Sequence, residues 1–130
     1  MTPEDKELLV KDLCARLPYG VKISIPDLWT QKREIEILDE IFKGDDGLYR
    51  VNSKGQCIEH IKPYLIPISN MNEVQKNIYS IYINELKQSN GIYFEKAFNS
   101  LQFWLYANHF DVNNLIPMGL AINAVGLNIY

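Results

Sequence analysis

The fold class is decided by the stretch KGDDGLYRVNSKG, residues 43–55. It contains two turn signals, Asp46-Gly47 and Lys54-Gly55, and the short run Leu48 to Val51 lies between them. A glycine that follows a polar residue is typical of the tight turns that join neighbouring antiparallel strands. The stretch therefore predicts two consecutive β-hairpins.

Strands are also predicted on both sides of these hairpins. Residues 21–25 and 34–37 alternate between apolar and polar side chains, and residues 57–61 form a further short run. Alternation with a period of two indicates strands with one buried and one wet face, which buries the isoleucines. We expect an antiparallel β-meander over residues 20–66, and its closure into a small SH3-like barrel is left open.

Helical patterns flank the predicted strands. A helix is predicted over residues 1–18, where Thr2 can cap the first turn. Residues 70–130 form a helical part with two helices, one ending at Ser89-Asn90-Gly91 and one running from about Phe94 to His109. We expect an α+β fold in which the two C-terminal helices pack against the meander.

Length and composition exclude several classes of protein. The 130 residues fit a single domain, residues 1–130, and 47% hydrophobic content argues against disorder of the whole chain. A net charge of −3 argues against broad phosphate binding. No uncharged apolar run reaches the ~18–20 residues of a membrane span, and the acidic start of the chain lacks the features of a secretory signal. We expect a cytoplasmic protein without membrane contact, in which Cys14 and Cys57 are free thiols.

Charge is unevenly distributed. Residues 1–66 contain 10 Lys or Arg and 12 Asp or Glu, whereas residues 67–130 contain only 3 and 4. The second half has 11 asparagines instead. The cores of protein interfaces are poor in charge. We therefore expect this half either to be largely covered by the rest of the chain or to face a partner.

The sequence offers only weak candidates for catalytic or metal-binding residues. Cys57 and His60 are close in sequence, but on one strand residues three apart point to opposite faces, and a dyad needs hydrogen-bond contact. His109 and Asp111 could be part of a metal site, but the chain has only two histidines. We interpret His109 as a cation at the negative end of a helix and Asp111 as the start of a turn. We expect no catalytic set, no metal and no cofactor.

Two other features are also interpreted as structural. Glu34 and Glu36 would share one strand face, which we expect to be the solvated face. Cys14 lies beside Leu13 and Leu17 on a helical stripe, and we expect it in the core.

Binding candidates lie in the β region. Leu28 and Trp29 occupy a loop between two strands, with Tyr49 on a later strand, and exposed Trp is a common interface anchor. As an alternative, a small barrel with basic rims could bind a nucleic acid. The residues for that alternative are Lys32, Arg33, Lys54 and Lys62.

Three stretches carry a resemblance. They are Leu13-Cys14-Ala15-Arg16-Leu17-Pro18-Tyr19-Gly20-Val21, then Ile61-Lys62-Pro63-Tyr64-Leu65 before Ser69-Asn70-Met71, and His109-Phe110-Asp111 leading to Leu115-Ile116 and Gly119-Leu120-Ala121. In this order they resemble a family of small uncharacterised proteins from gut anaerobic bacteria, their phages and mobile elements. The resemblance implies a cytoplasmic location and a phage-related role, and it brings no catalytic residues.

These observations together favour a non-enzymatic interaction module. Its partner is expected to be another protein, and self-association into a homo-oligomer is a related expectation. The alternatives are a nucleic-acid-binding small β-barrel and an enzyme with no recognisable motif.

Overall fold

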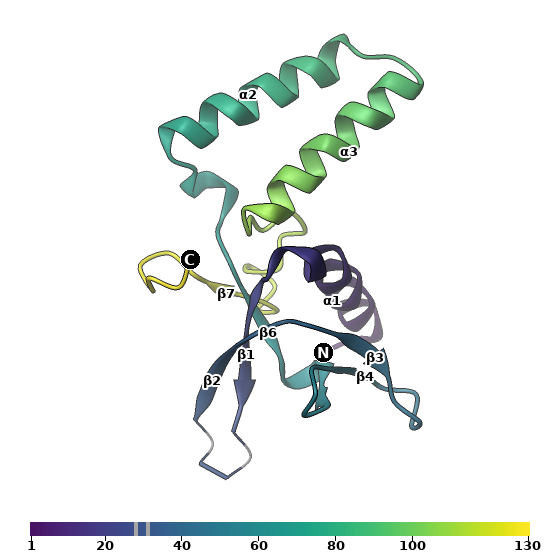
Figure 1. Ribbon diagram of the computed structural model, residues 1–130, viewed down its shortest axis with the longest axis vertical. Coiled ribbons are helices and arrows are strands. Elements are labelled where there is room, and N and C mark those ends of the chain that lie inside the picture. Colours follow the sequence, from purple (N-terminus) through teal and green to yellow (C-terminus); the bar gives the residue numbers. More distant parts are fainter. Residues whose placement is uncertain (28, 31) are drawn as a thin grey trace.

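A computed structural model describes residues 1–27, 29–30 and 32–130 (Figure 1). It confirms the α+β class. The elements are α1 (Pro3–Arg16), β1 (Lys22–Pro26), β2 (Arg33–Ile37), β3 (Ile41–Lys43), β4 (Tyr49–Val51), β5 (Gln56–Cys57), β6 (Lys62–Leu65), α2 (Glu73–Gln88), α3 (Ile92–Ala107) and β7 (Ile122–Asn123), with short 3-10 turns at Leu17–Tyr19, Ile58–His60 and Ile68–Asn70. Within the described part of the chain, no helix has both the length and the apolar character needed to cross a bilayer.

The strands form two sheets. One has the order β2-β1-β6-β7, and the other has the order β3-β4-β5. Both predicted hairpins are confirmed, because β4 pairs antiparallel with β3 and with β5. The SH3-like barrel is not closed: β6 leaves the meander to pair with β1, and β7 adds to β6 in parallel. The sheets therefore stay separate, and β2 lies at an edge of the first.

The strand predicted over residues 57–61 is wrong beyond its first residue. β5 ends at Cys57, and Ile58–His60 forms a 3-10 turn. The turn brings Ile58 and Ile61, which are three apart, into the same core, where both are buried. An extended strand would send two such residues to opposite faces.

α1 supplies the helical side of the main core. The predicted cap is confirmed, since Thr2 Oγ1 accepts the amide of Asp5 at 3.1 Å in a capping box. Leu9 and Leu13 are fully buried in the core. Cys14 was predicted in the core but is exposed, because one residue beyond Leu13 the helix has turned by about 100°.

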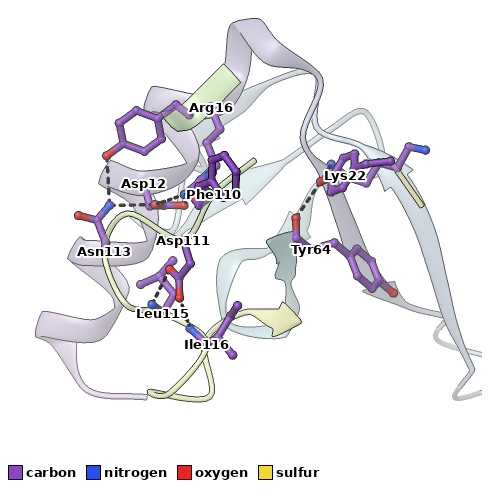
Figure 2. A network of polar contacts seen from close by, with 11 residues as sticks. Asp12, Arg16, Lys22, Tyr64, Phe110, Asp111, Asn113, Leu115 and Ile116 are labelled. Atoms are coloured by element: carbon purple, nitrogen blue, oxygen red, sulfur yellow. Dashed lines mark hydrogen bonds and ion pairs between the residues drawn. The ribbon is translucent and has the colours of Figure 1, made fainter. Parts of the chain in front are cut away.

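A buried polar network fixes the end of α1 (Figure 2). Arg16 Nε donates to Asp12 Oδ2 at 2.7 Å, and both side chains have no exposed surface. Arg16 Nη2 also donates to the Phe110 carbonyl at 2.6 Å. Asp12 Oδ1 accepts the Asn113 amide at 2.8 Å, and the same amide contacts the Tyr106 hydroxyl at 3.2 Å. The network therefore ties α1 to α3 and to the segment that follows α3.

The three stretches that carry the resemblance meet around this network. Ile66 donates its amide to the His109 carbonyl and accepts the Asp111 amide, each at 2.8 Å. The carboxylate of Asp111 then accepts the amides of Leu115 and Ile116 at 2.8 and 2.9 Å (Figure 2). These residues therefore form the frame of the fold.

The last residue closes a gap in the first sheet. In the ladder between β1 and β6, Ile23 pairs with Pro63, so the next pair would be Lys22 with Tyr64. Instead, the hydroxyl of Tyr130 accepts the Lys22 amide and donates to the Tyr64 carbonyl, each at 2.8 Å. The tyrosine hydroxyl thus takes the place of a backbone hydrogen bond.

α2 and α3 form a helical hairpin that projects away from both sheets (Figure 1). They pack on each other and not on a sheet, which differs from the expected arrangement. Besides the polar network, their main apolar contact with the rest of the chain is a second cluster at the base of the hairpin, whose buried residues are Met71, Leu101, Leu105 and Phe110. The outer part of the hairpin stands clear of the body.

Candidate interaction surface

α3 is rich in apolar residues, and its few polar residues gather on one side. Only five of its 16 residues are polar: Glu95, Lys96, Asn99, Ser100 and Gln102. A helix with so wide an apolar face normally packs that face against other parts of a protein. In α3 only Leu101 and Leu105 are buried, so most of its apolar surface has no cover from this chain.

The uncovered surface begins where the body of the protein ends. Phe94, Phe98, Leu101 and Leu105 are spaced by four, three and four residues, and therefore lie on one stripe of the helix. The two leucines near the base are buried, whereas the two phenylalanines near the tip are exposed. Their rings stack on each other with centroids 6.4 Å apart. Within the monomer, the half of the stripe near the base is packed and the half near the tip is exposed.

Other sides of α3 are more exposed still. Ile92 is 64% exposed and Phe103 is 62% exposed. Together with Lys96 and Asn99 they form a second stripe at helical spacing. Tyr93 is also exposed. Three of the chain's five phenylalanines are therefore on α3 with their side chains open to solvent.

α2 adds to this surface. Asn72 caps the helix by accepting the amide of Gln75 at 2.8 Å. None of its 16 residues is buried. Val74 and Ile81, seven residues apart on one face, are exposed apolar side chains. The two helices together form the candidate surface, which we call the hairpin surface.

The predicted partner contacts lie elsewhere. Trp29 is 94% exposed in the loop between β1 and β2, at the end of the molecule opposite the α2–α3 hairpin (Figure 1). Leu28 lies outside the described residues. Tyr49 is on β4, with Lys43 Nζ 5.5 Å from the centre of its ring. Trp29 is thus an exposed loop residue, and the larger exposed apolar surface lies on the hairpin.

The predicted nucleic-acid residues lie on different elements of the β region. The guanidinium of Arg33 is held within the sheet, where it donates to Ser24 Oγ at 2.5 Å and to the His60 carbonyl at 2.7 Å. Lys54 is in the turn between β4 and β5, in the other sheet. Lys32 precedes β2 and Lys62 begins β6. The acidic β2 residues lie between them in sequence and further weaken a basic field.

The residues considered for catalysis have structural surroundings. Cys57 ends β5 and His60 ends the 3-10 turn, and both cysteines are free thiols as predicted. Asp111 accepts two amides and so starts a turn, as expected. Across the described ranges, no group of three or more His, Cys, Asp or Glu side chains could hold a metal ion.

His109 differs from its predicted role as a cation at a helix end. It follows α3 with a positive φ of 64°, and its ring stacks on that of Tyr130 with centroids 3.8 Å apart. Burial, helped by the charges of Arg16 and Lys22, lowers the pKa of His109 to about 4. The imidazole is therefore neutral at pH 7.

Replacing His109 with asparagine, which also tolerates positive φ, is expected to flatten the loss of stability in mild acid. Between the ordinary pKa of 6.5 and the folded pKa of about 4, the unfolded chain binds a proton that the folded chain does not. The contribution of His109 to the free energy of unfolding is therefore complete above pH 6.5. It decreases as the pH falls below 6.5, and it is fully lost once the pH has fallen through about 4. Urea unfolding near pH 7 and near pH 5 measures the difference. Equal losses in both proteins would contradict this explanation.

The isoleucines of β2 are not buried as predicted, whereas Glu34 is exposed as expected. Ile35 and Ile37 are 51% and 56% exposed. Glu34 and Glu36 pair with the core residues Ile25 and Ile23, and thus share the inner face of the sheet. Both faces of β2 are open to solvent because the strand lies at the edge of the sheet.

The Asp12–Arg16 pair was also missed, although the sequence carries a signal for it. An acid and a base four residues apart can pair on a helix, and these two share the stripe of Leu9 and Leu13.

Comparison of the chain with models of protein families, with curated proteins and with solved structures finds no match.

Proposed function

We propose that this protein is a non-enzymatic interaction module that self-associates through the hairpin surface. The observation that carries the proposal is the apolar character of α3, in which only two residues are buried. Large apolar patches are rare on monomeric proteins and mark interaction sites. A second copy of the chain can provide the missing cover.

The size of the surface fits such a contact. Seven large apolar side chains of the hairpin are exposed: Val74, Ile81, Ile92, Tyr93, Phe94, Phe98 and Phe103. At about 100 Å² for each partly exposed side chain, they present on the order of 700 Å². A stable interface buries about 800 Å² on each partner. Because the side chains lie on several sides of α3, a neighbouring pair of helices would cover them better than one flat surface.

Charge favours a second copy. The hairpin carries three acids and three bases, Glu73, Lys76, Glu85, Lys87, Glu95 and Lys96. Its net charge is zero, so two identical hairpins do not repel each other, although the whole chain has a net charge of −3. The β1–β2 hairpin and the second sheet, which belong to the charged half of the chain, lie away from the α2–α3 hairpin (Figure 1).

The stripe of α3 defined by Ile92 and Phe103 also fits itself in an antiparallel arrangement. Because these residues stand at its two ends, antiparallel pairing places Ile92 of each copy against Phe103 of the other. Parallel pairing would place Lys96 against its own copy, and like charges in direct contact are destabilising. We therefore expect a two-fold symmetric antiparallel bundle of four helices.

The double variant Ile92→Ser/Phe103→Ser is expected to weaken self-association at least tenfold. Each side chain is mostly exposed in the monomer, so its removal costs the fold little and the interface much. Sedimentation velocity across a dilution series measures the dissociation constant of wild type and variant.

The matched control replaces Glu4 and Lys11, two exposed residues of α1 outside the hairpin surface, with serine, which leaves the net charge unchanged. It should associate as the wild type does. Equal dissociation constants for the wild type and the Ile92/Phe103 variant would rule out this stripe as the contact.

The cytoplasmic location and the phage-related role implied by the resemblance remain part of this proposal. Nucleic-acid binding is less favoured, because Arg33 is engaged by Ser24 and His60. The absence of a nucleic-acid shift at low salt would be consistent with this ranking.

A further inference from the structure

The free edge of β2 offers a second binding site, separate from the hairpin surface. β2 is the first strand in the order β2-β1-β6-β7, and the β1–β2 hairpin projects from the body of the protein (Figure 1). An edge strand presents unpaired backbone donors and acceptors that can pair with another strand. Which groups are presented follows from the ladder with β1.

The ladder alternates between two kinds of residue pair. Leu38 donates to the Val21 carbonyl at 2.9 Å, and Asp27 donates to the Lys32 carbonyl at 2.7 Å. These pairs are hydrogen-bonded, so every second pair between them is hydrogen-bonded as well. In β2, residues 34 and 36 therefore bond to β1, and residues 33, 35 and 37 direct their backbone groups to the free edge.

Two further contacts agree with this pattern. Pro26, which has no N–H to donate, pairs with Arg33 in a pair that needs no hydrogen bond. The carbonyl of Ile37 accepts the side-chain amide of Asn52 at 2.9 Å, as an outward carbonyl can. Asn52 thereby closes one end of the edge. The backbone groups of Arg33 and Ile35 and the amide of Ile37 face outward.

The side chains along this edge define its partner. Ile35 and Ile37 lie exposed on the outer face, and Glu34 and Glu36 lie on the inner face. Residues that face each other across a strand pair interact, and opposite charges stabilise the pair while like charges destabilise it. A complementary strand therefore has apolar residues on one face and Lys or Arg on the other.

We propose that β2 binds an extended segment of a partner protein in which apolar residues alternate with basic ones, by strand addition. A second copy of β2 is a poor occupant, because antiparallel pairing centred on Ile35 puts Glu34 opposite Glu36 twice. Trp29, in the loop next to β2, can cover the end of the added strand. Since this site lies at the opposite end of the molecule from the hairpin surface (Figure 1), it does not depend on self-association.

The test uses two peptides of about seven residues with blocked ends, one alternating lysine with valine and one alternating glutamate with valine. The full chain is titrated with each at low ionic strength, where exposed charges are least screened. Backbone amide shifts are followed by NMR. The lysine peptide is expected to bind at least tenfold more tightly, with the largest shifts at Arg33, Ile35 and Ile37.

Two variants test the two parts of the inference. Ile35→Pro removes an outward amide without breaking a bond to β1, and should weaken binding of the lysine peptide at least tenfold. Ile35→Thr keeps the amide and is its control. Glu34→Lys/Glu36→Lys should reverse the preference towards the glutamate peptide, and this variant decides the matter if Ile35→Pro does not fold.

Either of two results would overturn the inference. One is equal affinity of the wild type for both peptides. The other is no shift at residues 33–37 at millimolar peptide concentration. Neither result depends on whether the hairpin surface associates.

Discussion

Replacing Arg16 with methionine is expected to destabilise the fold by about 3–5 kcal/mol. The guanidinium makes three hydrogen bonds, two to Asp12 and one to the Phe110 carbonyl. It also lies over the Tyr106 ring, 4.8 Å from its centre. Without Arg16, the Asp12 carboxylate stays buried with only the Asn113 amide as a side-chain partner, and an unpaired buried charge is costly.

Urea unfolding followed by circular dichroism measures this effect at a fixed low protein concentration, since self-association adds to apparent stability. The double variant Asp12→Leu/Arg16→Met removes both charges and should be more stable than the single variant. A loss below about 1 kcal/mol in the single variant would mean that the pair does not secure the end of α1.

Replacing Phe110 with alanine is expected to cost about 3–5 kcal/mol. The ring is fully buried at the base of the hairpin, with its centre 5.7 Å from that of Trp104. Its loss leaves a cavity between α3 and the segment of Ile66, with which Phe110 pairs. We expect the hairpin to lose its fixed position as well, because this cluster is its main apolar contact with the body.

The same substitution at Phe103 provides the control. Phe103 is exposed on α3, so Phe103→Ala should change the free energy of unfolding of the monomer by less than about 0.5 kcal/mol. It should instead weaken self-association. Similar stability losses at both positions would show that Phe103 is covered within one chain and is not open to a second copy.

Local signals predicted the local structure well. The two glycine turns give both hairpins around β4, and Thr2 and Asn72 cap the helices that they precede. Each depends on a few neighbouring residues whose backbone preferences are strong. These parts of the fold could be predicted because their causes lie within a short window of sequence.

Features set by distant contacts could not be predicted in this way. The alternation of β2 predicts buried isoleucines, but the pairing with β1 places Glu34 and Glu36 on the inner face. Residues 57–61 have strand-like composition, but the core draws Ile58 and Ile61 to one side. Where β6 pairs with β1 depends on the whole chain, and no local pattern encodes it.

The candidate surface was only partly visible in the sequence. The low charge of the second half pointed to the right region, and Trp29 was correctly singled out as a loop tryptophan that is exposed. The sequence predicts that the two C-terminal helices pack against the meander, but periodicity does not tell whether an apolar face packs inside one chain or against another. Only the arrangement of the hairpin reveals that its outer half has no cover.

The molar mass of the wild-type protein as a function of concentration tests the central claim most directly. Sedimentation equilibrium from about 1 µM to about 1 mM covers the affinities expected for an interface of this size. Self-association through the hairpin surface predicts a mass that rises towards twice that of one chain. A mass equal to that of one chain throughout the series would contradict it.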